Sequence, residues 1–206
     1  MHYQFIQRMI LQVDPKMPYC SIRIYHDLER VDPLGRSLSQ PPILAKEAIS
    51  ALLVQIQSEW EASKEYQMLW SILSSIQLPS SIAKIVAFSL SAISVDRRNE
   101  GWNRRSAYQH VLVITLRDML SALALSTPEI DCYVQEPDYP ANDTAVLSEH
   151  SIRVLRDPQG FLELDDATAL ISVNSLIPVK QIVAELAMPP LIIWDYDDPS
   201  KDLMQK

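Results

Sequence analysis

The sequence predicts an α/β fold in which helices cover a mainly parallel five-stranded sheet, and three observations predict it. Short apolar runs of strand length alternate with stretches of helical spacing along the last two thirds of the 206 residues. Some runs, such as residues 191–194, are apolar throughout, which is typical of parallel strands buried on both faces. Because crossovers between parallel strands are right-handed, the alternation favours a Rossmann-like three-layer sandwich with strand order 3-2-1-4-5.

The N-terminal part of the chain has a different pattern. Residues 3–12 and 20–25 are rich in aromatic and β-branched types and flank an Asp-Pro-Lys-Met-Pro turn, which indicates a β-hairpin. From residue 43 to 76 apolar side chains recur at helical spacing, which predicts one helix or two in tandem. We therefore expect residues 1–80 to form a hairpin and helical extension packed on an α/β core of residues 81–206, as one structural unit.

In the predicted core, strands and helices alternate. The expected strands lie near residues 83–90, 131–136, 152–155, 168–173 and 191–194. The expected helices lie near residues 103–125, 142–149 and 178–187. Since open α/β sheets bind ligands outside the carboxyl ends of their strands, the polar residues that follow each strand are the first candidates for a functional site.

The composition argues against several classes of protein. Hydrophobic residues make up 48% of the chain and charged residues 21%, which is typical of a globular protein rather than a disordered one. A formal net charge of −8 argues against a partner that is nucleic acid or an anionic membrane surface. The chain has no run of roughly 20 apolar residues, which is the length needed to span a bilayer.

Cysteine content indicates the compartment. The two cysteines are Cys20 and Cys132, and Cys132 falls inside a predicted buried strand, so a disulfide framework is not expected. Polar residues interrupt the N-terminus before an apolar signal core can form. We therefore expect a cytoplasmic protein, with the nucleus as the alternative.

Two arginines, Arg104 and Arg105, stand at the predicted start of a long helix, where the helix dipole disfavours cations. One interpretation is an anionic ligand held by the helix N-terminus together with both guanidinium groups. The other is a structural network of ion pairs. The acidic residues expected to join such a network are Glu100, Glu136 and Asp138.

Glu136 and Asp138 flank a proline at the end of the second core strand, beside Tyr139. In dinucleotide-binding folds an acidic residue at this end of the sheet binds ribose hydroxyls, although here it comes later than the usual spacing of about 20 residues. The two carboxylates could also act as acid and base if burial raised the pKa of one of them. Ordinary turn and cap chemistry is the third interpretation, since turn-forming residues continue from residue 138 to 143.

His110 lies about one turn inside the same long helix. It would act as a general base if it faced the ligand, and the alternative is a half-exposed structural histidine. The cysteines and histidines show no metal-ligand spacing, and the chain has no serine nucleophile flanked by an elbow glycine. We therefore expect no metal and no hydrolase triad.

Other polar residues follow the remaining strands. If the sheet is parallel, these residues open on one edge, and convergence of that kind is typical of a ligand-binding pocket. The candidate ligand-binding residues at these strand ends are Ser89, Ser91, Asn174 and Asp195. Capping of nearby backbone amides is the alternative role for the Asn174-Ser175 pair.

Five segments in order resemble the SRR1-like domain, particularly that of fungal proteins. They are residues 85–94, 104–110, 133–139, 152–166 and 178–194. The resemblance covers about residues 82–195. The family is named for plant light signalling and clock regulation, and relatives have been linked to haem metabolism and microtubule phenotypes, so the resemblance implies no general enzymatic activity. If the haem connection applied, it would suggest His110 as an axial ligand.

The sequence departs from the resemblance at the turn after the first core strand. Relatives commonly carry a glycine there, whereas residues 88–94 read Phe-Ser-Leu-Ser-Ala-Ile-Ser. Glycine permits left-handed dihedrals and close approach of a ligand to the backbone. Its absence therefore predicts a weaker phosphate cradle, and no Gly-x-Gly-x-x-Gly pattern occurs in the chain.

We therefore expect an SRR1-like protein that binds a small, anionic or oxygen-rich molecule in a cleft at the carboxyl ends of the strands, with a regulatory or metabolic role. The alternative is a cofactor-free isomerase, cyclase or dehydratase of specialised metabolism that uses the same cleft. Its catalytic residues would be Glu136, His110, Tyr139 and Asp138. No cofactor is expected, with nucleotide or haem as alternatives. A homodimer or a protein partner would contact residues 43–76.

Overall fold

The computed structural model describes the backbone of most of the chain. The described residues are 2–12, 21–31, 34, 43–78, 81–95, 102–137, 139–173, 175 and 178–195. Side chains are described within these ranges from residue 34 onward, with residue 102 excepted. Cys20, Asp138 and Asn174 lie outside the described residues, so their predicted roles stay predictions.

The N-terminal part forms a hairpin and two tandem helices, as predicted. Strands β1 (His2–Gln12) and β2 (Ser21–Val31) pair antiparallel, and helices α1 (Lys46–Glu61) and α2 (Lys64–Ser75) follow. The side chain of Ser63 accepts a hydrogen bond from the amide of Tyr66, and this N-cap explains where the second helix begins.

The remaining elements form the α/β core. They are β3 (Ile82–Phe88), α3 (Trp102–Ala122), β4 (Ser126–Gln135), α4 (Ala141–Glu149), β5 (Ile152–Leu155), α5 (Gln159–Leu162), β6 (Thr168–Ser172), α6 (Val179–Leu186) and β7 (Leu191–Trp194). All strand pairs of this five-stranded sheet are parallel, and the order is β5-β4-β3-β6-β7. The predicted α/β fold and the predicted order 3-2-1-4-5 are therefore confirmed.

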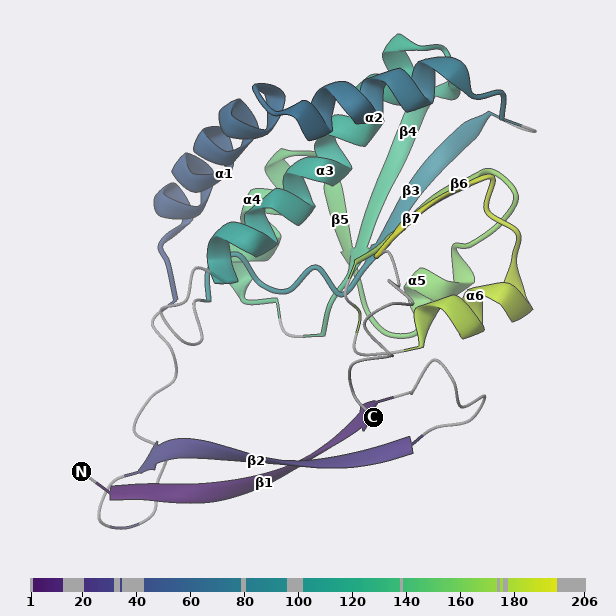
Figure 1. Cartoon of the computed structure of the whole chain (residues 1–206). Helices are drawn as coiled ribbons and strands as arrows, with labels where there is room; N and C mark the ends of the chain where they lie inside the picture. Colours follow the sequence, from purple (N-terminus) through teal and green to yellow (C-terminus); the bar gives the residue numbers. More distant parts are fainter. Residues whose placement is uncertain are drawn as a thin grey trace.

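Helices cover both faces of the five-stranded sheet (Figure 1). Helices α3 and α4 lie on one face with α1 and α2 outside them, and α5 and α6 lie on the other face. The central strand β3 contributes to both sides: Ile85 and Ala87 join the cluster that contains α3 residues, and Val86 and Phe88 join the cluster that contains α5 and α6 residues. Burial on both faces explains why this strand reads as one apolar run.

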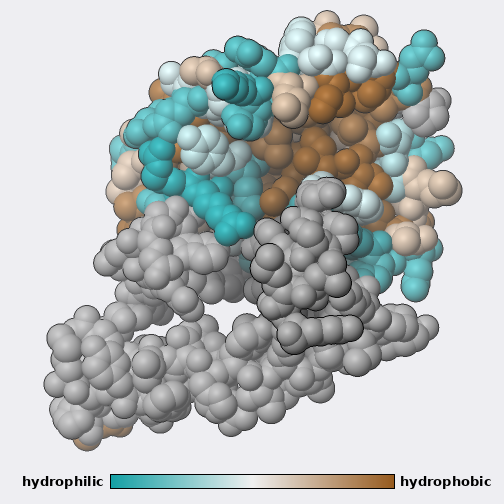
Figure 2. All heavy atoms as spheres, viewed as in Figure 1, coloured by the Kyte–Doolittle hydropathy of each residue, from teal (hydrophilic) through white to brown (hydrophobic). Residues whose placement is uncertain are grey.

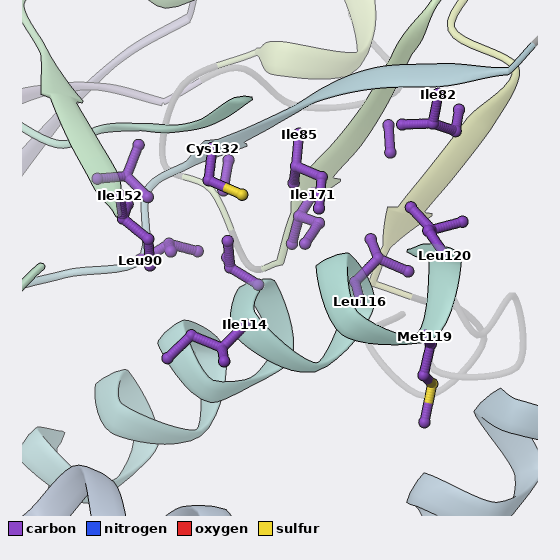
Figure 3. Close-up of a cluster of buried hydrophobic side chains, with 14 of the residues drawn as sticks. Ile82, Ile85, Leu90, Ile114, Leu116, Met119, Leu120, Cys132, Ile152 and Ile171 are labelled. Atoms are coloured by element: carbon purple, nitrogen blue, oxygen red, sulfur yellow. The ribbon is translucent and has the colours of Figure 1, made fainter. Parts of the chain in front are cut away.

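The main hydrophobic cluster fills the space between α3 and the sheet. Leu116 and Leu120 of α3 point toward the strands, where Ile85 and Ile171 lie (Figure 3). All four side chains have 0% exposure, and burial of each stabilises the fold by roughly 1.5–3 kcal/mol. Cys132 is also buried here as a free thiol, as its position inside a core strand predicted.

The outer helical layer is attached mainly through α1. Its buried residues Ile49, Leu53 and Ile56 pack against α3 and α4, and Lys46 forms an ion pair with Glu149 of α4. In α2, by contrast, Leu73 is the one residue classed as fully buried. The first helix is therefore an integral part of the core, while the second lies on its margin.

The sheet is unevenly covered near its β7 edge. Leu191 and Ile193 of β7 are half-buried against the main cluster, and Trp194 is 42% exposed. Hydrophobic residues gather on this side of the molecule, in the region between α2 and α6 (Figure 2). The centre of the sheet around β3 and β4 is fully covered, and the candidate site lies at the carboxyl ends of these strands.

Candidate functional site

The strand order changes direction between β3 and β6, and this is the point where doubly wound proteins bind ligands. Ser89 directly follows β3, and Ser175 follows β6. Their hydroxyl oxygens are 2.7 Å apart, so a hydrogen bond joins the two chain segments across this point. Gln109 of α3 adds a weaker contact, donating from Nε2 to the carbonyl of Val173 at 3.4 Å.

The turn after β3 adopts the left-handed conformation without glycine. Ser89 has a φ of 61° and Ser91 a φ of 60°. A non-glycine residue in this region carries a strain of roughly 1–2 kcal/mol. Two serines thus form a left-handed turn of the kind that glycine usually permits, while the predicted weakening of a phosphate cradle stays a prediction. The strand also ends at Phe88 rather than near residue 90, since these dihedrals terminate it.

Two contacts, one with Glu136 and one with α3, hold Ser91 in its left-handed conformation. The amide of Ser91 donates to Oε2 of Glu136 at 3.1 Å, and Glu136 directly follows β4. The carbonyl of Ser91 accepts from the hydroxyl of Ser106 on α3 at 2.6 Å. The structure therefore brings the predicted residues Ser91 and Glu136 into direct contact, and Glu136 supports the backbone of the turn.

His110 and Tyr139 form a hydrogen-bonded pair close to this turn. Nδ1 of His110 lies 2.7 Å from the carbonyl oxygen of Ser106, and Nε2 lies 2.6 Å from the hydroxyl of Tyr139. Because a carbonyl can only accept, Nδ1 carries the proton and Nε2 accepts from the tyrosine. His110 is fully buried rather than half-exposed.

The electrostatics of the pair favour two neutral groups. Burial lowers the pKa of His110 to about 4, although the Ser106 carbonyl and Asp143 oppose this shift. Burial also raises the pKa of Tyr139 well above its usual value, with smaller contributions from Glu136 and Asp143. Protonating His110 at pH 7 would cost roughly 4 kcal/mol. The arrangement is therefore suited to hydrogen bonding by the phenol rather than to proton abstraction by the imidazole.

Arg104 has a partner outside the predicted set. Nη2 of Arg104 lies 2.6 Å from Oε2 of Glu59 on α1, and Tyr108 donates to the same oxygen at 2.7 Å. The Tyr108 hydrogen bond, followed by one from Gln55, lowers the pKa of Glu59. Glu59 was not among the predicted carboxylates, because sequence alone could not place α1 beside α3, and two of those predicted, Glu100 and Asp138, lie outside the described residues. Arg105 is exposed.

Asp195 follows β7 at the same edge of the sheet. Its Oδ2 lies 3.9 Å from Nζ of Lys180 in the first turn of α6, and the same ammonium group lies 5.1 Å from the centre of the Trp194 ring. These contacts connect Asp195 to α6. Of the predicted site residues, Ser89, Ser91, Glu136, His110 and Tyr139 are thus linked around β3 and β4, and Arg104 and Asp195 contact other elements.

Sequence reasoning missed two polar residues that are buried at this end of the sheet. Gln135, at the end of β4, accepts from the amide of Gly160 at 2.6 Å and donates to Asp157 at 3.0 Å. Asp143, in the first turn of α4, accepts from the amides of Ile93 and Ser94. An Asp early in a helix suggests only an interaction with the helix dipole, so no sequence signal indicated these long-range contacts.

Within the described ranges, no three His, Cys, Asp or Glu residues gather as metal ligands would. None of the described helices is both long and apolar enough to cross a bilayer.

The fold and the site define a doubly wound α/β protein whose polar strand-end residues surround a strained turn at the switch point. The sequence model of the SRR1 domain matches residues 72–194, which is more than half of the chain. The chain therefore belongs to the SRR1 domain family, as its motifs predicted. No curated protein and no solved structure matches it.

Proposed function

We propose that this SRR1 domain protein binds a small, hydroxyl-rich molecule at the carboxyl ends of β3, β4 and β6. The observation that carries the proposal is the turn after β3, where Ser89 and Ser91 are both left-handed. Strained backbone of this kind persists when its surroundings hold it in place, and it is concentrated at ligand-binding sites. Here β4, α3 and the segment after β6 all contribute contacts that hold it.

Glu136 supports a ligand with hydroxyl groups. It follows the second strand of the sheet, where dinucleotide-binding folds place the carboxylate that accepts from ribose hydroxyls. Its side chain is half-buried, so the acceptor is partly shielded from water. The hydroxyls of Ser89 and Ser175 lie across the switch point and supply both donors and acceptors.

The same groups favour a neutral ligand over an anionic one. Arg104, the main candidate for binding an anion, already pairs with Glu59. The carboxylate of Glu136 lies at the turn instead, and the chain has a formal net charge of −8. An anionic ligand would meet this negative charge, whereas hydroxyl groups would donate to it.

Binding is better supported than catalysis by the same residues. The imidazole of His110 already accepts from Tyr139, and its pKa of about 4 keeps it neutral at physiological pH. A general base would need a pKa nearer the working pH. We therefore favour Tyr139 as a fixed polar group of the site over the isomerase, cyclase or dehydratase alternative.

The proposal can be tested with adenosine, which carries ribose hydroxyls and no phosphate, and with AMP, which carries both. Titration calorimetry should detect adenosine binding, and Glu136→Gln should weaken it roughly tenfold because a charge-assisted hydrogen bond becomes a neutral one. Glu129→Gln is the matched control, since Glu129 is exposed in the first half of the same strand.

Two further results decide between the interpretations. Arg104→Ala should leave adenosine affinity unchanged, because its guanidinium contacts α1. Binding of AMP alone, with a loss of affinity in Arg104→Ala, would support the anionic ligand instead. If ribose, adenosine and AMP all fail to bind the wild-type protein, the proposed ligand class is wrong.

A further inference from the structure

We propose that Asp143 is the positioning residue of this site: its buried carboxylate holds the turn after β3 in its ligand-binding shape, at a cost in stability. This inference rests on the proposed function and concerns the same turn. Asp143 belongs to α4, about fifty residues along the chain from the turn that it contacts. It therefore joins two separate elements of the core.

The contacts of Asp143 are short and go to backbone groups. Its Oδ1 accepts from the amide of Ile93 at 2.6 Å and from the amide of Ser94 at 3.0 Å. Hydrogen bonds from backbone amides to a carboxylate are roughly twice as strong as bonds between neutral groups. Asp143 therefore holds the end of the turn, while Glu136 and Ser106 hold its middle at Ser91.

The N-terminal segment that precedes α1 contacts the end of the turn as well. The amide of Leu44 donates to the carbonyl of Ser94 at 2.9 Å, and Asn142 donates from Nδ2 to the carbonyl of Leu44 at 2.9 Å. Asn142 and Asp143 are adjacent in the first turn of α4. This pair thus connects the turn, the N-terminal segment and α4 at one junction.

The burial of Asp143 would be unfavourable if this residue served only to stabilise the fold. Its side chain has 0% exposure, and within the described part of the chain its second oxygen, Oδ2, has no hydrogen-bond partner. Ser94 Oγ is likewise buried and without a partner there. A buried carboxylate with one unsatisfied oxygen destabilises the folded state, so a neutral residue of the same shape would suit stability better.

Asp143 also acts on the other polar residues of the site through its charge. It contributes to raising the pKa of Tyr139, and it partly opposes the lowering of the pKa of His110. The charge of the carboxylate therefore influences the His110 and Tyr139 pair, while its hydrogen bonds hold the turn. A residue that maintains the turn and acts electrostatically on the phenol is well placed to set the affinity of the site.

The test is the isosteric variant Asp143→Asn, compared with Asp118→Asn, which changes an exposed Asp of α3. The asparagine keeps an acceptor for the two amides but removes the charge. We expect its melting temperature to equal or exceed that of the wild type. We also expect hydrogen exchange at the amides of Ile93 and Ser94 to accelerate about tenfold, and adenosine affinity to fall about tenfold.

This combination of expected results distinguishes a positioning residue from a residue with a purely structural role. A structural residue would lose stability and binding together, so an unfolded Asp143→Asn variant, or one with a clearly lower melting temperature, would overturn the proposal. Unchanged exchange at Ile93 and Ser94 would overturn it as well. If adenosine does not bind even the wild type, the proposed function fails, whereas the exchange rates still show whether the charge of Asp143 holds the turn.

Discussion

At the scale of single residues, the turn after the first core strand has serine at two positions, Ser89 and Ser91, whose backbone conformation favours glycine. Both are left-handed, and the contacts of Ser91 with Glu136 and Ser106 offset the strain at that residue. The sequence indicated that these serines and Glu136 lie at one edge of the sheet. It could not indicate their dihedrals, because these depend on contacts with residues that are distant in the chain.

The strain at Ser91 predicts an unusual response to glycine. Ser91→Gly removes the strain but adds freedom to the unfolded chain, so the free energy of unfolding should stay within about 0.5 kcal/mol of the wild type. Ser71→Gly is the control, because Ser71 is exposed inside helix α2, where glycine should cost about 0.5–1 kcal/mol. Urea denaturation measures both. Equal losses in the two variants would show that Ser91 is not strained.

The buried imidazole of His110 predicts a pH dependence of stability. The pKa is about 4 in the folded state and about 6.5 in the unfolded state, so the unfolded chain binds the extra proton first. The contribution of the neutral imidazole to the free energy of unfolding is therefore fully present above pH 6.5. It is lost as the pH falls from 6.5 toward 4. Between pH 7.5 and 5.0 the wild type should lose about 2 kcal/mol through this group.

Urea denaturation of His110→Gln at the two pH values checks this prediction. The variant should lose about 2 kcal/mol less than the wild type between them, because glutamine does not titrate. His150→Gln, at the end of α4, should keep the wild-type dependence. If His110→Gln shows the wild-type dependence too, the imidazole is not held neutral in the way that its contacts suggest.

At the scale of elements, the sequence predicted the alternation of strands and helices well. Strands β5 and β7 have the predicted bounds, since short apolar runs between turn residues mark them clearly. Helix α5 was missed because it has only four residues, begins after Pro158 and contains Gly160. Its position depends on Gln135 of β4, which contacts both Gly160 and Asp157. A contact between distant segments of this kind has no local pattern.

The close packing of α5 on the sheet predicts that Gly160→Ala is destabilising. A Cβ atom at this position would lie 2.7 Å from Oε1 of Gln135 and 3.0 Å from the ring of Phe88, which stacks on Phe161. Overpacking of this kind costs about 1–3 kcal/mol. Thermal or urea denaturation should show the loss, whereas Leu162→Ala, at a 76% exposed position of the same helix, should have little effect. A stable Gly160→Ala protein would show that α5 is not tightly packed.

At the scale of the whole molecule, the five-stranded sheet carries the predicted polar residues to one edge, but only some of them contact one another. Hydrophobic pattern sufficed to predict the edge, because the direction of parallel strands follows from their connections. The hydrophobic pattern could not predict that Arg104 pairs with Glu59, because this contact depends on how α1 packs against α3. Helix α1 of the extension is thus part of the core.

The hairpin predicts a contrast between two truncations. Strands β1 and β2 pair with each other and with no strand of the larger sheet, and an isolated two-stranded hairpin is marginally stable. Residues 43–206 should therefore unfold cooperatively within a few degrees of the full chain. Residues 46–206 should be less stable, because they lack the hydrogen bonds of Leu44 with Ser94 and Asn142. Calorimetry compares them, and equal melting temperatures would contradict the role of Leu44.

The central claim is that the carboxyl ends of β3, β4 and β6 form the ligand site. Hydrogen exchange of the full chain with and without adenosine tests it most directly. We predict protection in residues 89–95 and 135–143, with no change in α1 and α2. Protection confined to the helical layer, or no protection in either segment at an adenosine concentration that saturates binding, would contradict the claim.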